Sequence, residues 1–155
     1  MPDTTTLPLA PMNPHAAISA FGYLRAVQAG DVEAAREFAG AEPRMAELLV
    51  DVVKRIVVPV TALPGLEEGE PSTEMFALEA LGRVLVASLR VWAQAGPDAA
   101  DGIARAVIDF VLQFLTDDHE DVAEVLRQLE AVGVGQALAA HPAPAGAHPV
   151  RLSIV

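Results

Sequence analysis

Two stretches near the middle of this chain are apolar on almost every side of a helix, residues 73–95 and residues 99–115. Their few polar residues recur mostly at steps of three, four or seven, so they fall on one narrow stripe of each helix. These residues are mainly Glu74, Glu79, Arg83, Arg90 and Gln94 in the first stretch and Asp101, Arg105, Asp109 and Gln113 in the second. A small domain can enclose one such helix, but two side by side indicate an apolar surface that continues into a partner, most simply a second copy.

The N-terminal half is predicted to contain three helices whose ends are marked by capping residues, glycine and proline. An N-cap asparagine followed by proline begins the first, an N-cap aspartate begins the second, and a proline opens the third. The predicted ranges are 14–29, which ends before Gly30; 32–39, which ends before Gly40; and 43–59, which Pro59 limits. A strand at 56–60 is the competing interpretation for the end of the third helix, but no partner strand is predicted.

The C-terminal half is predicted to contain the two apolar helices and a final amphipathic helix, 119–132. Gly133 and Gly135 are predicted to end that last helix, leaving one further turn at 136–140. The predicted N-caps of the three helices are Ser72, Asp98 and Asp118.

These elements predict an all-α fold, a compact bundle of five to six helices. Residues 1–12 hold three prolines and three threonines and are predicted to be a disordered N-terminal segment. The helical bundle is predicted to be a single domain over residues 13–140. Residues 141–155 are predicted to be a Pro/His/Ala-rich linker followed by a short apolar C-terminal tail.

Hydrophobic residues make up 52% of the chain, but charged residues interrupt every candidate for a membrane span. No uninterrupted apolar run reaches the roughly 18 residues that cross a bilayer. The N-terminal residues lack the basic region of a signal peptide. We therefore expect a cytoplasmic protein. The absence of cysteine excludes disulfides, thiolate zinc sites and cysteine nucleophiles.

The net charge of −11 is concentrated in the second half of the chain. Residues 1–66 hold five basic and seven acidic side chains, whereas residues 67–155 hold five basic and fourteen acidic. Binding to nucleic acid requires clustered Lys and Arg, which the chain lacks, so we expect no nucleic-acid partner. A basic protein or a metal ion is the partner that this charge favours. The alternative is that the acidic residues only keep an apolar protein soluble. The acidic residues predicted to face a basic partner are Glu67, Glu68, Glu70 and Glu120.

An acidic segment that follows the second apolar helix has metal-binding spacing. Asp117, Asp118 and Asp121 fit the pattern DDxxD. The segment resembles the aspartate-rich motif of class I terpene synthases and prenyltransferases. That resemblance implies an all-α protein in which these carboxylates hold Mg²⁺ and the metal holds a diphosphate. Members of that family also carry a second metal motif, which this chain lacks. The interpretation without a metal makes Asp118 an N-cap with Asp121 in the first helical turn.

No other pattern carries catalytic chemistry. The four histidines lack metal-ligand spacing, no serine lies in a nucleophile elbow, and no glycine-rich phosphate loop occurs. The sequence therefore favours a protein that is not an enzyme and has no cofactor. Mg²⁺ would be bound only if the resemblance to the aspartate-rich motif holds.

The apolar helices lead to the functional prediction. The sequence predicts an acidic adaptor, regulatory or scaffold module that works through protein–protein contacts and forms a homo-oligomer. The alternative is a binding protein for an apolar small molecule, such as a prenyl diphosphate held through Mg²⁺. The residues predicted to form the interface, or the wall of that pocket, are Met75, Phe76, Leu85, Trp92, Phe110 and Phe114.

Overall fold

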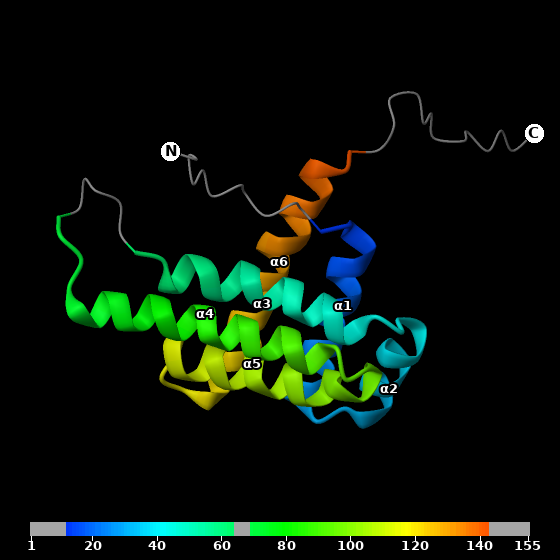
Figure 1. Ribbon diagram of the computed structural model, residues 1–155. Helices are drawn as coiled ribbons and strands as arrows, with labels where there is room; N and C mark the ends of the chain where they lie inside the picture. Colours follow the sequence, from blue (N-terminus) through cyan, green and yellow to red (C-terminus); the bar gives the residue numbers. More distant parts are fainter. Residues whose placement is uncertain (1–11, 64–68, 143–155) are drawn as a thin grey trace, which may run out of the picture.

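The computed structural model describes residues 12–63 and 69–142, and in these two stretches the chain forms six α-helices and no strand (Figure 1). The helices are α1 (Pro14–Ala29), α2 (Val32–Ala41), α3 (Met45–Thr61), α4 (Thr73–Ala93), α5 (Ala100–Phe114) and α6 (Val122–Ala140). Short 3₁₀ turns at Pro97–Ala99 and His119–Asp121 precede α5 and α6. The predicted all-α bundle is confirmed.

Helix α1 lies at the centre of the bundle and contacts α2, α3, α5 and α6. Helices α3 and α4 run side by side over most of their length, and α5 packs against both of them (Figure 1). The main core forms where α1, α3 and α5 meet, around the fully buried side chains of Leu24, Met45, Leu49 and Ile103. Helix α4 therefore covers one side of this core while its own opposite side stays at the surface.

The predicted N-caps of α1, α2 and α4 are confirmed by hydrogen bonds from backbone amides. The side chain of Asn13 accepts from the N–H of His15 at 2.9 Å, and that of Asp31 accepts from the N–H of Ala34 at 3.0 Å. Ser72 accepts from the N–H of Met75 at 3.3 Å. Each bond pairs an amide that the first helical turn leaves without a partner, which fixes where the helix begins.

The prediction that Pro59 limits the third helix is wrong by two residues, and the competing strand at 56–60 is not formed. Helix α3 continues to Thr61, with Pro59 inside its last turn. The proline removes only one amide donor there. The hydroxyl of Thr61 donates to the carbonyl of Val57 at 2.8 Å and closes the turn.

The prediction that Gly133 and Gly135 end the last helix is also wrong, because α6 continues to Ala140. A helical glycine costs only about 1 kcal/mol relative to alanine. The ring of Phe21 on α1 packs directly against Gly133, and Ala137 is buried one turn later. Contact with α1 therefore holds α6 helical across both glycines.

The predicted N-cap role of Asp98 is wrong as well. Asp98 lies inside the 3₁₀ turn Pro97–Ala99, and α5 has no side-chain cap. Gly96, at φ 115°, bends the chain into this turn, so the new helical direction begins before Asp98 is reached. No helix in the described part of the chain combines the length and the hydropathy that crossing a membrane requires.

Candidate interaction surface

Helix α4 has a buried face that packs on α3. The buried positions are Gly82, Val86, Leu89 and Ala93, which recur at steps of four, three and four. A Cβ atom on Gly82 would overlap the side chain of Thr61, so the two helices approach more closely here than any larger residue would permit. The steps and the close approach fix the rotation of α4 about its axis.

The opposite face of α4 carries a second row of residues, which we call the outer stripe. Its members are Ala77, Leu81, Val84, Ser88 and Val91, and all five are exposed. Their steps of four, three, four and three follow the 3.5-residue period of a helix seam that packs against another helix. No charged residue interrupts this row. The stripe thus has the spacing and the uncharged composition of a helix-packing surface, although it faces outward.

An apolar groove adjoins the outer stripe, between α4 and α5. It measures about 230 Å³ and is lined by Leu81, Leu85, Ala106, Asp109, Phe110, Gln113 and Phe114. The rings of Phe110 and Phe114 stack with their centroids 4.6 Å apart. Phe110 is buried at the base of the groove, whereas Phe114 is exposed at its edge. The groove therefore widens the apolar surface from one helix to two.

Trp92 extends the same surface towards the other end of α4. Its ring packs so closely on Gly102 of α5 that a Cβ atom at position 102 would overlap it. The other side of the ring is open, and 45% of Trp92 is exposed. The side chain is thus held in place by α5 while it offers a large apolar area outward.

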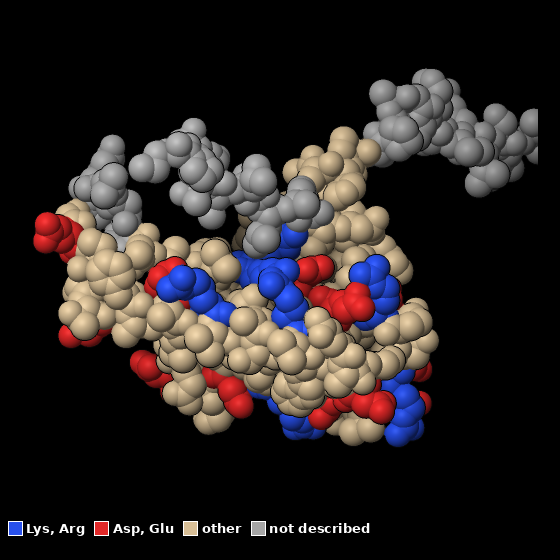
Figure 2. Space-filling view, in the orientation of Figure 1, with Lys and Arg blue, Asp and Glu red and all other residues tan. Residues whose placement is uncertain are grey.

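Charged side chains border this apolar surface on both sides. Figure 2 shows an uncharged band along the line of α4 with charged groups gathered above and below it. On the α3 side, Arg83 pairs with Glu79 at 3.1 Å, and Arg90 forms no ion pair with another described residue. On the α5 side, Asp109 likewise forms none within the described ranges. One border therefore offers an unengaged cation and the other an unengaged anion.

The six predicted interface residues are not all brought together. Leu85, Phe110 and Phe114 line the groove, and Trp92 lies on the same side of α4 at its C-terminal end. Met75 and Phe76 are exposed in the first turn of α4, outside the groove. The outer stripe itself was missed by the sequence analysis, because its residues are smaller than the aromatic ones that drew attention.

The predicted acidic surface is described only in part. Glu67 and Glu68 lie outside the described residues, while Glu70 and Glu120 are exposed. Asp118 accepts a hydrogen bond from the N–H of Glu120 at 2.9 Å, so it caps the 3₁₀ turn His119–Asp121, whereas α6 itself begins after this turn with no side-chain cap. Among the described residues, no three His, Asp or Glu side chains are placed to hold a metal ion, so the Mg²⁺ alternative at Asp117, Asp118 and Asp121 gains no structural support.

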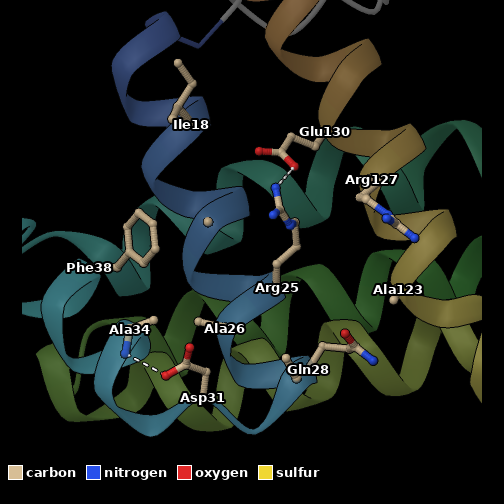
Figure 3. Close-up of a pocket in the computed structure, with 12 residues that line it drawn as sticks. Ile18, Arg25, Ala26, Gln28, Asp31, Ala34, Phe38, Ala123, Arg127 and Glu130 are labelled. Atoms are coloured by element: carbon tan, nitrogen blue, oxygen red, sulfur yellow. Dashed lines mark hydrogen bonds and ion pairs between the residues drawn. The ribbon is translucent and has the colours of Figure 1, made fainter.

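A second concavity, of about 510 Å³, lies over α1 between α2 and α6 (Figure 3). Arg25 of α1 and Glu130 of α6 form an ion pair across it, 2.7 Å apart, and Arg127 stands beside them. Phe38 of α2 forms the opposite wall and packs on Gly22, which leaves no room for a Cβ atom there. Its polar groups are paired with one another or lie at the rim, so they do not converge on a reacting atom.

The sequence analysis missed this concavity, because its walls come from α1, α2 and α6, and α6 lies far from the other two in the chain. Gly22 was the available signal. A glycine inside a helix that it does not end indicates the close approach of another group.

Comparisons of this chain with protein-family models, with curated proteins and with solved structures find no match. The geometry of the described residues therefore carries the functional argument by itself.

Proposed function

We propose that this protein is a non-enzymatic interaction module that self-associates through the apolar surface of α4 and α5. The observation that carries the proposal is the outer stripe, an uncharged row with helix-packing spacing that faces away from the core. The adjoining groove and Trp92 enlarge it into one surface.

Exposure of this surface is costly for a monomer. Leu81, Val84, Val91, Trp92 and Phe114 are all exposed and lie on the two adjacent helices. Burying apolar area stabilises a protein by about 25 cal/mol per Å². Contiguous apolar patches beyond a few hundred Å² commonly mark interaction sites in soluble proteins. A second copy would remove this area from water.

The area available reaches the lower limit of what a specific dimer needs. At about 1.5 Å per residue, α4 is roughly 31 Å long and α5 roughly 22 Å, and each helix is about 10 Å wide. The two helices offer on the order of 500 Å² per copy, or roughly 1,000 Å² for a pair, which is where specific interfaces begin. The α4 stripe alone would fall short, so the α5 groove takes part.

The groove supports a dimer better than it supports the small-molecule alternative. Its volume of about 230 Å³ lies below the roughly 300–1,000 Å³ of ligand pockets, and no polar groups converge inside it to orient a ligand.

Self-association leaves the acidic residues at the surface, where they would recruit a basic partner. Glu70, Asp117 and Glu120 are exposed and carry like charge. Contacts of this kind act mainly on association rate and weaken as salt rises. Recruitment should therefore be stronger at low ionic strength and should fail when these residues are neutralised.

The test compares two variants in native mass spectrometry and sedimentation velocity over a range of concentrations. Val91, on the outer stripe, and Val32, on α2, are each 67% exposed. Val91→Glu buries a charge in the proposed interface and should convert the dimer to a monomer with unchanged helical content. Val32→Glu makes the same chemical change outside the interface and should leave the dimer intact.

Three results would overturn the proposal. A wild-type chain that is monomeric at every concentration would contradict self-association. Equal effects of the two variants would show that the outer stripe plays no special part. Additional mass of a few hundred daltons on a monomer would point instead to a bound small molecule.

A further inference from the structure

The outer stripe can meet a second copy of itself in two symmetric ways, which differ in the direction of the helices. In a parallel pair each stripe residue faces its own counterpart, and the α3-side border of one copy faces the α5-side border of the other. In an antiparallel pair Ala77 faces Val91, Leu81 faces Ser88, and each border faces the same border. The contents of the two borders decide between them.

The two edges of the stripe differ in side-chain size. The edge on the α3 side carries Ala80 and Ala87, seven residues apart. The edge on the α5 side carries Leu78, Leu85 and Trp92, at the same spacing. Positions of this kind flank the seam of a helix pair and contact across it. One edge is therefore a row of small side chains and the other a row of large ones.

A parallel pair matches these rows, because small residues of one copy meet large residues of the other. When two helices pack in parallel, a residue on one edge contacts the residue five positions further along the facing edge of the partner helix. Ala80 then faces Leu85, and Ala87 faces Trp92. An antiparallel pair would place alanine against alanine, leaving a void, and the large side chains against one another.

The charges at the borders favour the same direction. In a parallel pair Arg83 of one copy lies towards the α5 side of the other, level with Asp109, which lines the groove beside Leu81 and Leu85. An antiparallel pair centred on Val84 would bring the two copies of Asp109 together, and likewise the two copies of Arg83. Placing like charges opposite one another disfavours a pairing.

We infer that two copies pair with their α4 helices parallel, with the Ala80 and Ala87 edge of each copy against the Leu85 and Trp92 edge of the other. This inference rests on the proposed self-association and specifies its geometry. The pair has a two-fold axis parallel to the α4 helices, so the contact between the two edges occurs twice, once on each side of the seam.

The absence of cysteine from the chain permits a direct test. Single-cysteine variants of the full chain, Val84→Cys, Ala77→Cys and Val91→Cys, are treated with a mild added oxidant and run on a non-reducing gel. Position 84 is the midpoint of the stripe and faces itself in either direction. In a parallel pair Ala77→Cys and Val91→Cys each form a disulfide dimer alone. In an antiparallel pair neither does so alone, and a mixture of the two forms a dimer.

The outcomes separate the inference from the proposed function. Disulfide dimers of all three single variants support parallel pairing. A dimer of Val84→Cys with cross-linking of the other two only on mixing overturns it while self-association stands. A dimer of Val84→Cys with no cross-linking of the others overturns it as well. If none of the three cysteine variants forms a disulfide dimer and the wild-type chain is monomeric, self-association itself is overturned.

A size exchange provides a second measurement. Ala87→Leu should weaken the dimer at least tenfold in a parallel pair, because the added side chain meets Trp92 of the other copy. Ala87→Leu combined with Trp92→Ala should restore much of that affinity. In an antiparallel pair Ala87→Leu would fill the void between alanines, so tighter association would contradict the inference. Circular dichroism of each variant shows whether the fold is retained.

Discussion

Helices α3 and α4 lie against each other and have similarly apolar sequences, yet they are buried to very different extents. Nine of the 17 residues of α3 are buried, against four of the 21 residues of α4. Helix α3 packs against α1, α4 and α5, whereas α4 packs chiefly against α3. The apolar content of a helix therefore indicates how much surface should leave water, and does not indicate whether the same molecule covers it.

The first way to test this comparison is to truncate a leucine on each helix. Leu49 on α3 is 0% exposed and Leu81 on α4 is 52% exposed. Leu49→Ala should lower the free energy of unfolding by about 2–5 kcal/mol, because it removes buried contacts and leaves a cavity. Leu81→Ala should change it by less than about 0.5 kcal/mol at concentrations where the chain is monomeric. Urea unfolding measures both, and equal losses would contradict the difference in burial.

The second prediction concerns the contact between the two helices. Gly82→Ala places a methyl group against Thr61 and should destabilise the protein by about 1–3 kcal/mol, as overpacking does. Gly40, in α2, has no atom near its missing side chain. Gly40→Ala should therefore stabilise the protein by roughly 0.5–1 kcal/mol through helix propensity. Thermal unfolding of both variants checks this, and stabilisation by Gly82→Ala would show that α3 and α4 can separate freely.

Most of the fold could be predicted from local signals. Asn13, Asp31 and Ser72 begin their helices where the capping patterns place them, because a cap depends on residues two or three positions away. The ends at Gly40, Pro59 and Gly133 were placed wrongly. Phe21 packs on Gly133 and holds α6 helical, and single-sequence patterns do not contain such tertiary contacts. The last turn of α3 is instead closed by the local hydrogen bond from Thr61 to Val57.

The candidate surface could be predicted only in outline. The apolar character of α4 was visible in the sequence, but the position of its buried face was not. That position depends on which residues meet α3, and Gly82 against Thr61 is what settles it. The concavity over α1 was invisible for the same reason, since its walls at Phe38 and Glu130 come together only on folding.

The third prediction is a small effect on stability at the contact between α1 and α6. Arg25 and Glu130 join α1 to α6 by an ion pair that is partly open to solvent. A double-mutant cycle with Arg25→Gln and Glu130→Gln should give a coupling energy of about 0.2–1 kcal/mol that falls in high salt. A coupling above about 2 kcal/mol would mean that this pair, rather than apolar packing, attaches α6.

The smallest effect concerns Tyr23, the single tyrosine of the chain, which is buried on α1. Burial raises the pKa of its hydroxyl above 10.0, and the nearby Asp101 raises it further. Because the folded state holds this proton more tightly than the unfolded state, its contribution to stability is full below about pH 10 and is lost as pH rises through the folded pKa. Ultraviolet titration of the folded protein should show a midpoint above that of the unfolded chain. A midpoint at or below the unfolded value would place Tyr23 at the surface.

The contact between α1 and α6 also determines when during synthesis the protein can finish folding. Arg25 and Glu130 are 105 positions apart in the chain, and Phe21 meets Gly133 over a similar separation. During synthesis α1 leaves the ribosome long before the helix that completes its surroundings. Contacts between distant parts of a chain slow folding, and a partly made chain keeps its apolar surface exposed meanwhile. The nascent chain therefore cannot bury the α6-facing surface of α1 until its last helix emerges.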